Sequence, residues 1–461
     1  MKVCESKLAF RFRRIIDKLP FGELLELERL KEALKSLSNW DLKKEEGVLE
    51  ALFKSSILNL LARTLGYLKN FAIAILLGFS VKTDGYFMAL SLLGIFLIFA
   101  DVFDSIGVPN LVKARQKNME EFKKLSGLLF TFTLILATLS TIFAVLLMPF
   151  ILKVPVGFKE EALAYTKSSY LILIPYVFLS FIFYHFGAVL RSLRRFTVYF
   201  LGEFIISVCS FIVVTLGLLY YRDYWVLPLS LTISQALATL FMVFKVREFL
   251  HIEFYMDDRI KSLLKQFLQL SALYGVFHLY MVVDRAFSSM LGEKAVSALT
   301  YGLMLAIASK NVLRIESLAI TSLSEAGGSL EKLNFYVKRL LLLSVPFSIL
   351  LFSFSEYIVG LLLGYGAFSK VDVALTSEAL RFYSLSVPFI FLWLLVYRVF
   401  QIREKMGKLV KLAVTGVFLN GGLNYLFVIE LKLGIPGICL GTLVAYVFLS
   451  LFGYSMLDKQ S

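Results

Sequence analysis

Residues 125–152 read LSGLLFTFTLILATLSTIFAVLLMPFIL, and none of these 28 residues carries a charge. An α-helix of this length rises about 42 Å, which exceeds the roughly 30 Å hydrocarbon core of a bilayer. A helix of a water-soluble protein normally keeps a polar face toward the solvent. This stretch therefore predicts a helix that crosses a membrane.

Comparable apolar blocks repeat along the whole chain, with polar loops between them. Of 461 residues, 58% are hydrophobic and 18% are charged, and the mean hydropathy is +0.78. Soluble domains average about 45–50% apolar residues. The sequence predicts an all-α polytopic membrane protein with about twelve transmembrane helices. They lie near residues 55–78, 85–106, 125–152, 165–190, 197–220, 225–245, 263–291, 295–323, 338–364, 378–401, 408–429 and 434–457.

The predicted spans form two groups of six. A Leu-Gly pair ends the first span of each group, at Gly78 and Gly292, and a Tyr opens the next span, at Tyr86 and Tyr301. Two similar halves around a central cavity are a common transporter plan. We therefore expect one six-helix lobe over residues 55–250 and a second over residues 251–461.

Residues 1–54 are expected to form a separate polar segment that contains an amphipathic helix. We interpret it as a cap on the cytoplasmic face, with a partner-docking helix or an interfacial membrane helix as alternatives. Because the segment precedes the first span, we hypothesise that transport does not need residues 1–50.

The basic residues lie mostly in loops on one side of the predicted bundle. The formal net charge is +14. Twenty-one Lys and Arg residues flank the spans on one side, among them Arg191, Arg194 and Arg195, and only eight flank them on the other. Cytoplasmic loops are enriched in positive residues. This rule explains the net charge without nucleic-acid binding, and it predicts that both termini are cytoplasmic.

Charged residues inside the spans are the candidate site, because each costs about 2.5–3.5 kcal/mol at the bilayer centre. Lys310 and Arg314 lie one turn apart on one helix face, where they repel each other. An anion is expected to neutralise them, and Arg pairs with phosphate through two parallel hydrogen bonds. We predict four substrate-binding cations, Arg63, Lys69, Lys310 and Arg314, supported by Asp84, Glu203, Asp284, Arg285, Glu316 and Arg398.

Structural roles are the alternatives for several of these residues. For Arg398 the alternative is extension of the side chain to the headgroups. For Asp284 and Arg285 it is a position at the outer interface. For Lys310 and Arg314 it is packing against the carboxylate of Glu316 or Glu203.

The sequence shows no catalytic or metal-binding pattern. It contains no phosphate-binding loop and no pair of His residues at metal-ligand spacing, and its three cysteines are widely separated. We therefore expect no catalytic residue, no metal and no cofactor. Transport is expected to be driven by a coupling ion, H+ or Na+, or by substrate mass action.

Four stretches resemble, in the right order, the motifs of one transporter family. They are residues 62–70 (ARTLGYLKN), residues 83–89 (TDGYFMA), Asp284 with residues 296–301 (VSALTY), and residues 383–388 (YSLSVP) followed by Arg398, Asn420, Asn424 and Thr442. Over most of residues 55–457 the chain resembles the MurJ (MviN) lipid II flippases of the multidrug/oligosaccharidyl-lipid/polysaccharide (MOP) exporter superfamily.

This resemblance implies a flippase that works by alternating access in the bacterial inner membrane. The implied substrate is a polyprenyl-pyrophosphate-linked sugar, lipid II or a close relative, and cell-wall synthesis proteins are possible partners. By position, Arg63 and Lys69 would bind the pyrophosphate, and Asp84 would support that end of its span. The sequence departs from the family motif at Lys69 and Asn70, where the family has Arg and Asp.

Other functions are alternatives to lipid II transport. The nearest is a flippase for another lipid-linked oligosaccharide, such as an O-antigen or exopolysaccharide unit. A drug or cation antiporter of the same superfamily would favour buried carboxylates over cations. A membrane-embedded glycosyl-transfer enzyme would need a catalytic carboxylate in a sizeable outer loop. A regulatory membrane protein that does not transport is the last alternative.

Overall fold

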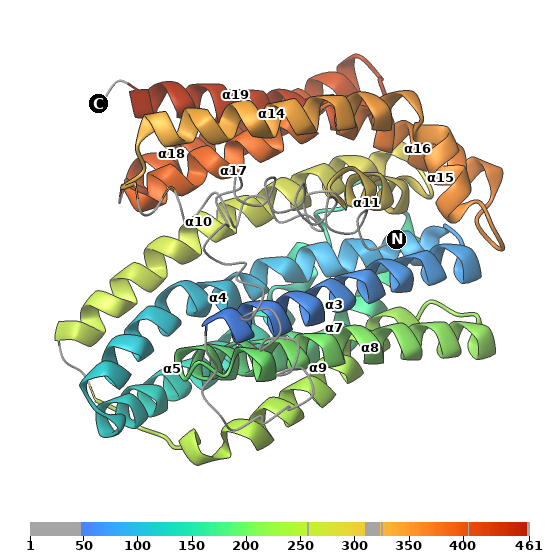
Figure 1. Cartoon of the computed structure of the whole chain (residues 1–461). Helices are drawn as coiled ribbons and strands as arrows, with labels where there is room; N and C mark the ends of the chain where they lie inside the picture. Colours follow the sequence, from blue (N-terminus) through green and yellow to red (C-terminus); the bar gives the residue numbers. More distant parts are fainter. Residues whose placement is uncertain (1–47, 256–257, 309–322, 324–325, 404, 459–461) are drawn as a thin grey trace, which may run out of the picture.

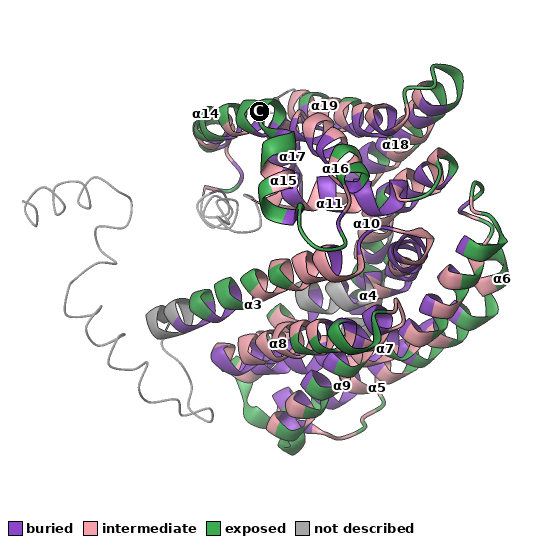
Figure 2. Cartoon of the chain, turned by 90° about the vertical axis from the view of Figure 1, so that its right-hand side faces the viewer, coloured by how far each residue is buried: buried purple, intermediate pink, exposed green. Residues whose placement is uncertain are grey.

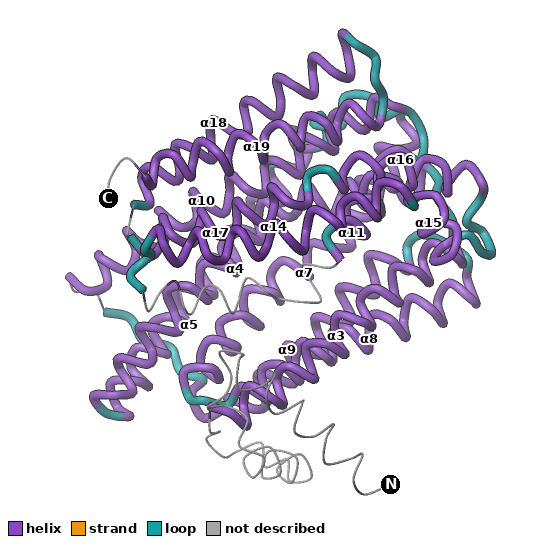
Figure 3. Tube along the Cα trace, turned by 45° about the horizontal axis from the view of Figure 1, so that its top comes forward, coloured by secondary structure: helices purple, strands orange, loops and turns teal. Residues whose placement is uncertain are grey.

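The computed structural model describes residues 48–255, 258–308, 323, 326–403 and 405–458. Within these ranges the chain consists of helices joined by short loops and contains no strand (Figure 3). The predicted all-α membrane fold is therefore confirmed. The N-terminal segment up to residue 47 and the predicted site residues Lys310, Arg314 and Glu316 lie outside the described residues.

The helices before residue 250 pack mainly on one another and form what we call the N-terminal bundle. In this bundle α4 lies against α7, and α3 lies against α8 (Figure 1). Its helices are α3 (Val48–Leu77), α4 (Val81–Lys117), α5 (Met119–Leu146), α6 (Met148–Ile151), α7 (Glu160–Ser192), α8 (Phe196–Tyr221) and α9 (Val226–Val246), followed by the 3-10 turn η1 (Arg247–Phe249).

The remaining helices form the C-terminal bundle. Its elements are α10 (Asp258–Ser288), η2 (Ser289–Leu291), α11 (Ala295–Ala306), α14 (Leu330–Ser353), α15 (Ser355–Leu363), α16 (Lys370–Ser384), α17 (Val387–Ile402), α18 (Met406–Asn424), the π-helix η3 (Tyr425–Glu430) and α19 (Ile435–Asp458). Helix α16 contacts α11, α14 and α19, whereas α10 contacts both α18 and α4 of the N-terminal bundle. The predicted domain boundaries at 54/55 and 250/251 stay predictions.

Among the described residues, ten helices are long and apolar enough to cross a membrane, and they coincide with ten of the predicted spans. The pair Lys370–Ser384 and Val387–Ile402 would make an eleventh span, bent by 49°. The predicted span near 295–323 begins with the shorter apolar helix Ala295–Ala306. Most of its remainder lies outside the described residues, so the count of twelve stays a prediction.

Proline explains two breaks within predicted spans. Pro149 and Pro388 occupy the first turns of α6 and α17. Proline has no backbone N–H and fits the start of a helix, but it disturbs a helix interior. The chain therefore ends one helix before each of these residues and begins another, which bends the span.

The two bundles are joined at the end of the molecule where α3 ends and where α4 and α11 begin. We call this the joined end, and Figure 2 views the molecule from that side. The N–H of Ala367 donates to the carbonyl of Ile75 at 2.7 Å, and the N–H of Gly157 donates to Ser289 Oγ at 3.1 Å. Gly78, at φ 70°, permits this approach, because a Cβ there would lie 2.5 Å from the Ala367 carbonyl oxygen.

Candidate functional site

Asp84 connects the two bundles through the first turn of α11. Its carboxylate accepts hydrogen bonds from the backbone N–H of Lys294 at 2.6 Å and of Ser297 at 2.8 Å, and from Ser297 Oγ at 2.6 Å. The Asp84 side chain is buried, on α4 of the opposite bundle. It thus caps a helix that begins 211 residues later in the sequence, where a negative charge also complements the helix dipole.

Two further charged groups hold the start of α11 from within the C-terminal bundle. The Nη1 atom of Arg285, which is buried on α10, donates to the carbonyl of Val296 at 3.3 Å and to the Thr300 hydroxyl. Lys294 Nζ lies 2.9 Å from Asp372 Oδ1, and Asp372 is itself buried. The predicted supporting residues Asp84 and Arg285 therefore both fix the position of α11.

Helices α3 and α11 meet beside the predicted cation Lys69. The hydroxyl of Tyr301 donates to the carbonyl of Asn70 at 2.7 Å, and Asn70 Nδ2 lies 3.1 Å from the Met304 sulfur. Lys69 is partly buried on α3. The structure therefore places Lys69 next to the residue through which α3 contacts α11, and its role in binding stays a prediction.

Arg63 lies on the same helix, six residues before Lys69. The two residues are separated by about 9 Å along the helix axis and by about 120° around it. Arg63 Nε donates to Asn59 Oδ1 at 2.6 Å, which holds the guanidinium along α3. Because Lys310 and Arg314 are outside the described residues, the grouping of the four predicted cations stays a prediction.

Glu203 lies within the N-terminal bundle, on α8, which packs against α3. Its carboxylate accepts a hydrogen bond from the Tyr199 hydroxyl at 2.6 Å. The guanidinium carbon of Arg191 lies 4.2 Å from the centre of the Tyr199 ring. A cation over an aromatic face is attracted to it. Tyr199 therefore contacts both Glu203 on α8 and Arg191 at the end of α7.

Arg398 lies apart from the joined end, near the end of α17. Its Nη1 atom donates to Gln401 Oε1 at 2.7 Å, and its guanidinium lies over the Tyr397 ring at 5.3 Å. These contacts are made within one helix turn, and the role of Arg398 stays a prediction.

Asp284 is the centre of a polar cluster inside the C-terminal bundle. Its Oδ1 accepts hydrogen bonds from the Nδ2 atoms of Asn420 and Asn424, both at 2.8 Å, and its Oδ2 accepts one from the Thr442 hydroxyl at 3.0 Å. The four residues come from α10, α18 and α19. The π-helix η3 begins directly after Asn424, and such local departures from the α-helix often mark functional sites.

The amide oxygens of Asn420 and Asn424 are buried and lack a hydrogen-bond partner within the described part of the chain. A Cβ at position 441 would lie 2.2 Å from Asn424 Oδ1, so the glycine there leaves room for that oxygen. An unpaired buried oxygen is costly and indicates that something else satisfies it. In the sequence Asn420, Asn424 and Thr442 are part of a motif only, and the structure adds them to the candidate site.

These features define a class of protein. Two bundles of membrane-spanning helices, hydrogen-bonded to each other at one end and carrying buried charged residues, form a two-lobed membrane transporter. A family model described as lipid II flippase MurJ matches residues 73–461. The chain belongs to the MurJ lipid II flippase family, which confirms the resemblance seen in the sequence.

Comparisons with individual proteins agree with this assignment. The chain is 27% identical over 427 residues to the probable lipid II flippase MurJ of Aquifex aeolicus, covering 89% of this chain and 84% of that protein. It is 26% identical over 430 residues to the probable lipid II flippase MurJ of Rickettsia prowazekii, covering 89% and 84%.

Solved structures share the fold. A lipid II flippase MurJ in an inward closed conformation matches with a TM-score of 0.72 at 22% identity, over 88% of this chain and 86% of that one. An inward-facing MATE family multidrug transporter of the MOP superfamily matches with a TM-score of 0.68 at 18% identity, over 88% and 99%. The predicted fold, two lobes of membrane-spanning helices, is therefore shared with these transporters.

Proposed function

We propose that this chain moves lipid II across the bacterial inner membrane by alternating access. Family membership over residues 73–461 supports the substrate. The cap that Asp84 places on α11 supports the mechanism, because it is a polar contact between two bundles that can break and re-form as they move. When one bundle moves against another, contacts of this kind are made in one state of a transporter and broken in the other.

Complementation tests the substrate. The full chain should sustain growth of a strain depleted of its own lipid II flippase, and lipid II should reach the outer leaflet in those cells. Growth without outward movement of lipid II would favour a regulatory protein. If instead only an O-antigen or exopolysaccharide export defect were rescued, the alternative lipid-linked oligosaccharide would be the substrate.

The orientation follows from charge. The end of the molecule opposite the joined end carries the basic residues at the end of α4 and between α7 and α8, among them Lys113, Arg194 and Arg195. By the positive-inside rule this basic end faces the cytoplasm. The joined end then faces outward, so the conformation in this structure holds the bundles together on the extracytoplasmic side.

The Asp284 cluster is proposed as the site of a coupling cation, with Na+ favoured. A half turn about the last side-chain bond exchanges the oxygen and nitrogen of an asparagine amide. With both amides exchanged, a carboxylate, two amide oxygens and the Thr442 hydroxyl would converge on one point. Hard cations prefer oxygen ligands. The site has one carboxylate, and Arg285 already offsets part of its negative charge, so a cation of charge +1 fits better than one of charge +2.

Cation-dependent stability tests this site. Na+ should raise the free energy of unfolding of the purified protein relative to choline at equal ionic strength, by about 2.7 kcal/mol at a hundredfold excess over the dissociation constant. The melting temperature should rise accordingly. Asp284→Asn and Thr442→Val should remove the response. Asp372→Asn, which changes another buried carboxylate of the same bundle, should keep it. A response to pH alone would indicate H+ as the coupling ion.

A further inference from the structure

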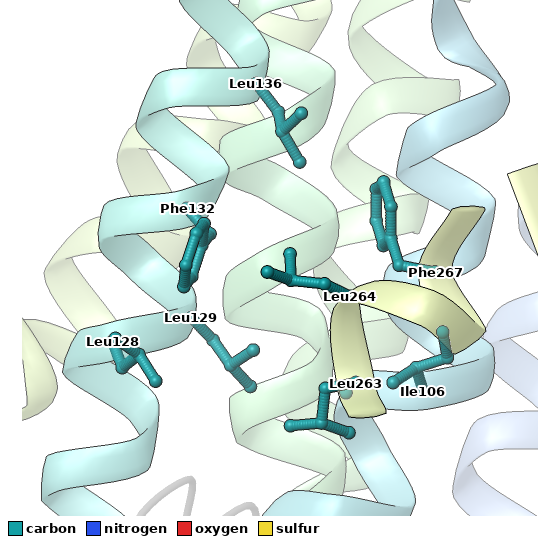
Figure 4. A pocket seen from close by; sticks show the side chains of 9 residues that line it. Ile106, Leu128, Leu129, Phe132, Leu136, Leu263, Leu264 and Phe267 are labelled. Carbon is teal, nitrogen blue, oxygen red and sulfur yellow. The ribbon is translucent and has the colours of Figure 1, made fainter. Parts of the chain in front are cut away.

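An apolar pocket lies between the two bundles, near the basic end. It is lined by nine residues of α4, α5 and α10, among them Ile106, Leu128, Phe132, Leu136, Leu264 and Phe267 (Figure 4). Its empty volume is about 450 Å³, which includes its open mouth. Helix α10 supplies the C-terminal bundle's share of the lining, so the pocket exists only while α10 lies against α4 and α5.

The surroundings of the pocket are apolar as well. Leu268, one turn after Leu264 on α10, is 67% exposed, and Leu139, one turn after Leu136 on α5, is 43% exposed. Side chains of this kind on a membrane-spanning helix face lipid. The mouth of the pocket therefore opens beside hydrocarbon chains of the bilayer.

An apolar pocket does not hold ordered water, because water needs polar partners. Left empty, its lining loses the dispersion contacts that neighbouring atoms would supply. A segment of one hydrocarbon chain has the shape and chemistry to restore them. In a bilayer, however, the hydrophobic effect does not favour one apolar chain over another, so selectivity must come from the headgroup.

Each of the three lining helices carries a lysine on the cytoplasmic side of the pocket. Lys124 precedes Leu128 by about 6 Å along α5, Lys261 precedes Leu264 by about 4 Å along α10, and Lys113 follows Ile106 by about 10 Å along α4. Lysine side chains extend toward the headgroups while their stems cover apolar surface. Three lysines there attract an anionic headgroup, and each adds roughly fivefold to its binding.

We propose that this pocket binds an anionic phospholipid of the inner leaflet, with one acyl chain between α5 and α10 and its phosphate among Lys113, Lys124 and Lys261. The bound lipid spans both bundles. It therefore favours the conformation in which α10 lies against α4 and α5, since a ligand shifts a protein toward the state that binds it better. This inference does not depend on which substrate is transported.

Native mass spectrometry of the full chain, released from detergent, tests the proposal. Phosphatidylglycerol should remain bound at lower concentrations than phosphatidylcholine with the same acyl chains. Leu264→Trp fills the pocket, and retention of phosphatidylglycerol should then fall about tenfold, because the chain loses the contacts of several methylene groups. Leu268→Trp, on the exposed face of the same helix, is the matched control and should retain the lipid.

A second pair of variants tests the headgroup. The triple change Lys113→Gln, Lys124→Gln and Lys261→Gln should abolish the preference for phosphatidylglycerol, a loss of about a hundredfold. The same change at Lys332, Lys338 and Lys408, which are exposed residues of the C-terminal bundle, should preserve it.

Three outcomes would overturn the proposal. Equal retention of both lipids, with no effect of the lysine changes, would mean that the pocket takes any acyl chain. Equal loss in Leu264→Trp and Leu268→Trp would mean that the lipid binds elsewhere. Displacement of phosphatidylglycerol by an equimolar polyprenyl phosphate would identify the tail of a lipid-linked sugar as the occupant.

Discussion

Arg63 is the predicted phosphate-binding residue on α3. Its Nε atom is held by Asn59, which fixes the plane of the guanidinium on α3. If it binds the substrate pyrophosphate, Arg63→Ala should abolish lipid II transport, since loss of a charged hydrogen-bond partner costs roughly 1.5–3 kcal/mol. Arg63→Lys should be only partly active, because lysine cannot form two parallel bonds. Complementation with matched expression measures both.

The control for this prediction is Arg247→Ala, which removes an exposed arginine of η1 and should transport normally. A stably inserted Arg63→Ala protein with full activity would remove Arg63 from the site. The same result for the double change Arg63→Ala, Arg314→Ala would refute the whole cationic cavity.

Asp84 is expected to stabilise the joined end. Asp84→Asn keeps the size of the side chain but weakens three charge-assisted hydrogen bonds, so the contact should lose about 1.5–3 kcal/mol. Ser297→Ala removes only one donor and should have a smaller effect. Labelling of a cysteine at the joined end by an impermeant reagent from outside the cell measures the opening. Unchanged labelling in Asp84→Asn would contradict the role of the cap.

The charged residues of the site were predictable, because charge in an apolar span is expensive and therefore conspicuous. Their partners were not. Asn420, Asn424 and Thr442 carry no charge, and nothing along α18 or α19 indicates that they face Asp284 on α10. The partners of Asp84 lie 210 and 213 residues away in the sequence, so only the fold brings them together.

At the scale of helices and loops, the turn after α3 is a sensitive point. Gly78 has a positive φ and packs against the loop that contains Ala367. Gly78→Ala should destabilise the protein by more than about 1 kcal/mol, from backbone strain and from collision with that loop. Gly66→Ala is the control on the same helix, because no atom of another helix or loop in the described part of the chain lies within 4 Å of its added Cβ. It should be neutral or stabilising by up to about 1 kcal/mol.

Thermal unfolding of both variants in the same detergent measures the difference. A Gly78→Ala protein as stable as Gly66→Ala would mean that the α3 turn does not hold the joined end together.

Most spans were predictable because length and hydropathy determine which segments cross a bilayer. The breaks within these spans were harder to predict from the sequence. The predicted span near 338–364 is divided at Phe354 into α14 and α15, although the only proline within α14, Pro346, leaves that helix continuous. The breaks before α6 and α17 have a visible cause in Pro149 and Pro388, whereas the sequence around Phe354 offers none.

For the whole molecule, the charge distribution predicts topology. A fluorescent protein that folds only in the cytoplasm should be bright when fused after Ser461. A phosphatase that is active only outside should be active when inserted in the loop between α6 and α7, at residues 152–159. The reverse pattern would mean that the joined end faces the cytoplasm.

Alternating access requires the joined end to open in every transport cycle. Ser297 Oγ lies 3.0 Å from Thr83 Oγ1, on opposite bundles, so two cysteines there can form a disulfide after a shift of about 1 Å. In a protein whose Cys4, Cys209 and Cys439 are replaced, Thr83→Cys with Ser297→Cys should lose transport on oxidation and regain it on reduction. Each single variant, treated identically, is the control. Peptide mass spectrometry establishes the fraction linked. Transport that persists in fully linked protein would show that the bundles need not separate at this end, and the alternating-access mechanism would then be wrong for this chain.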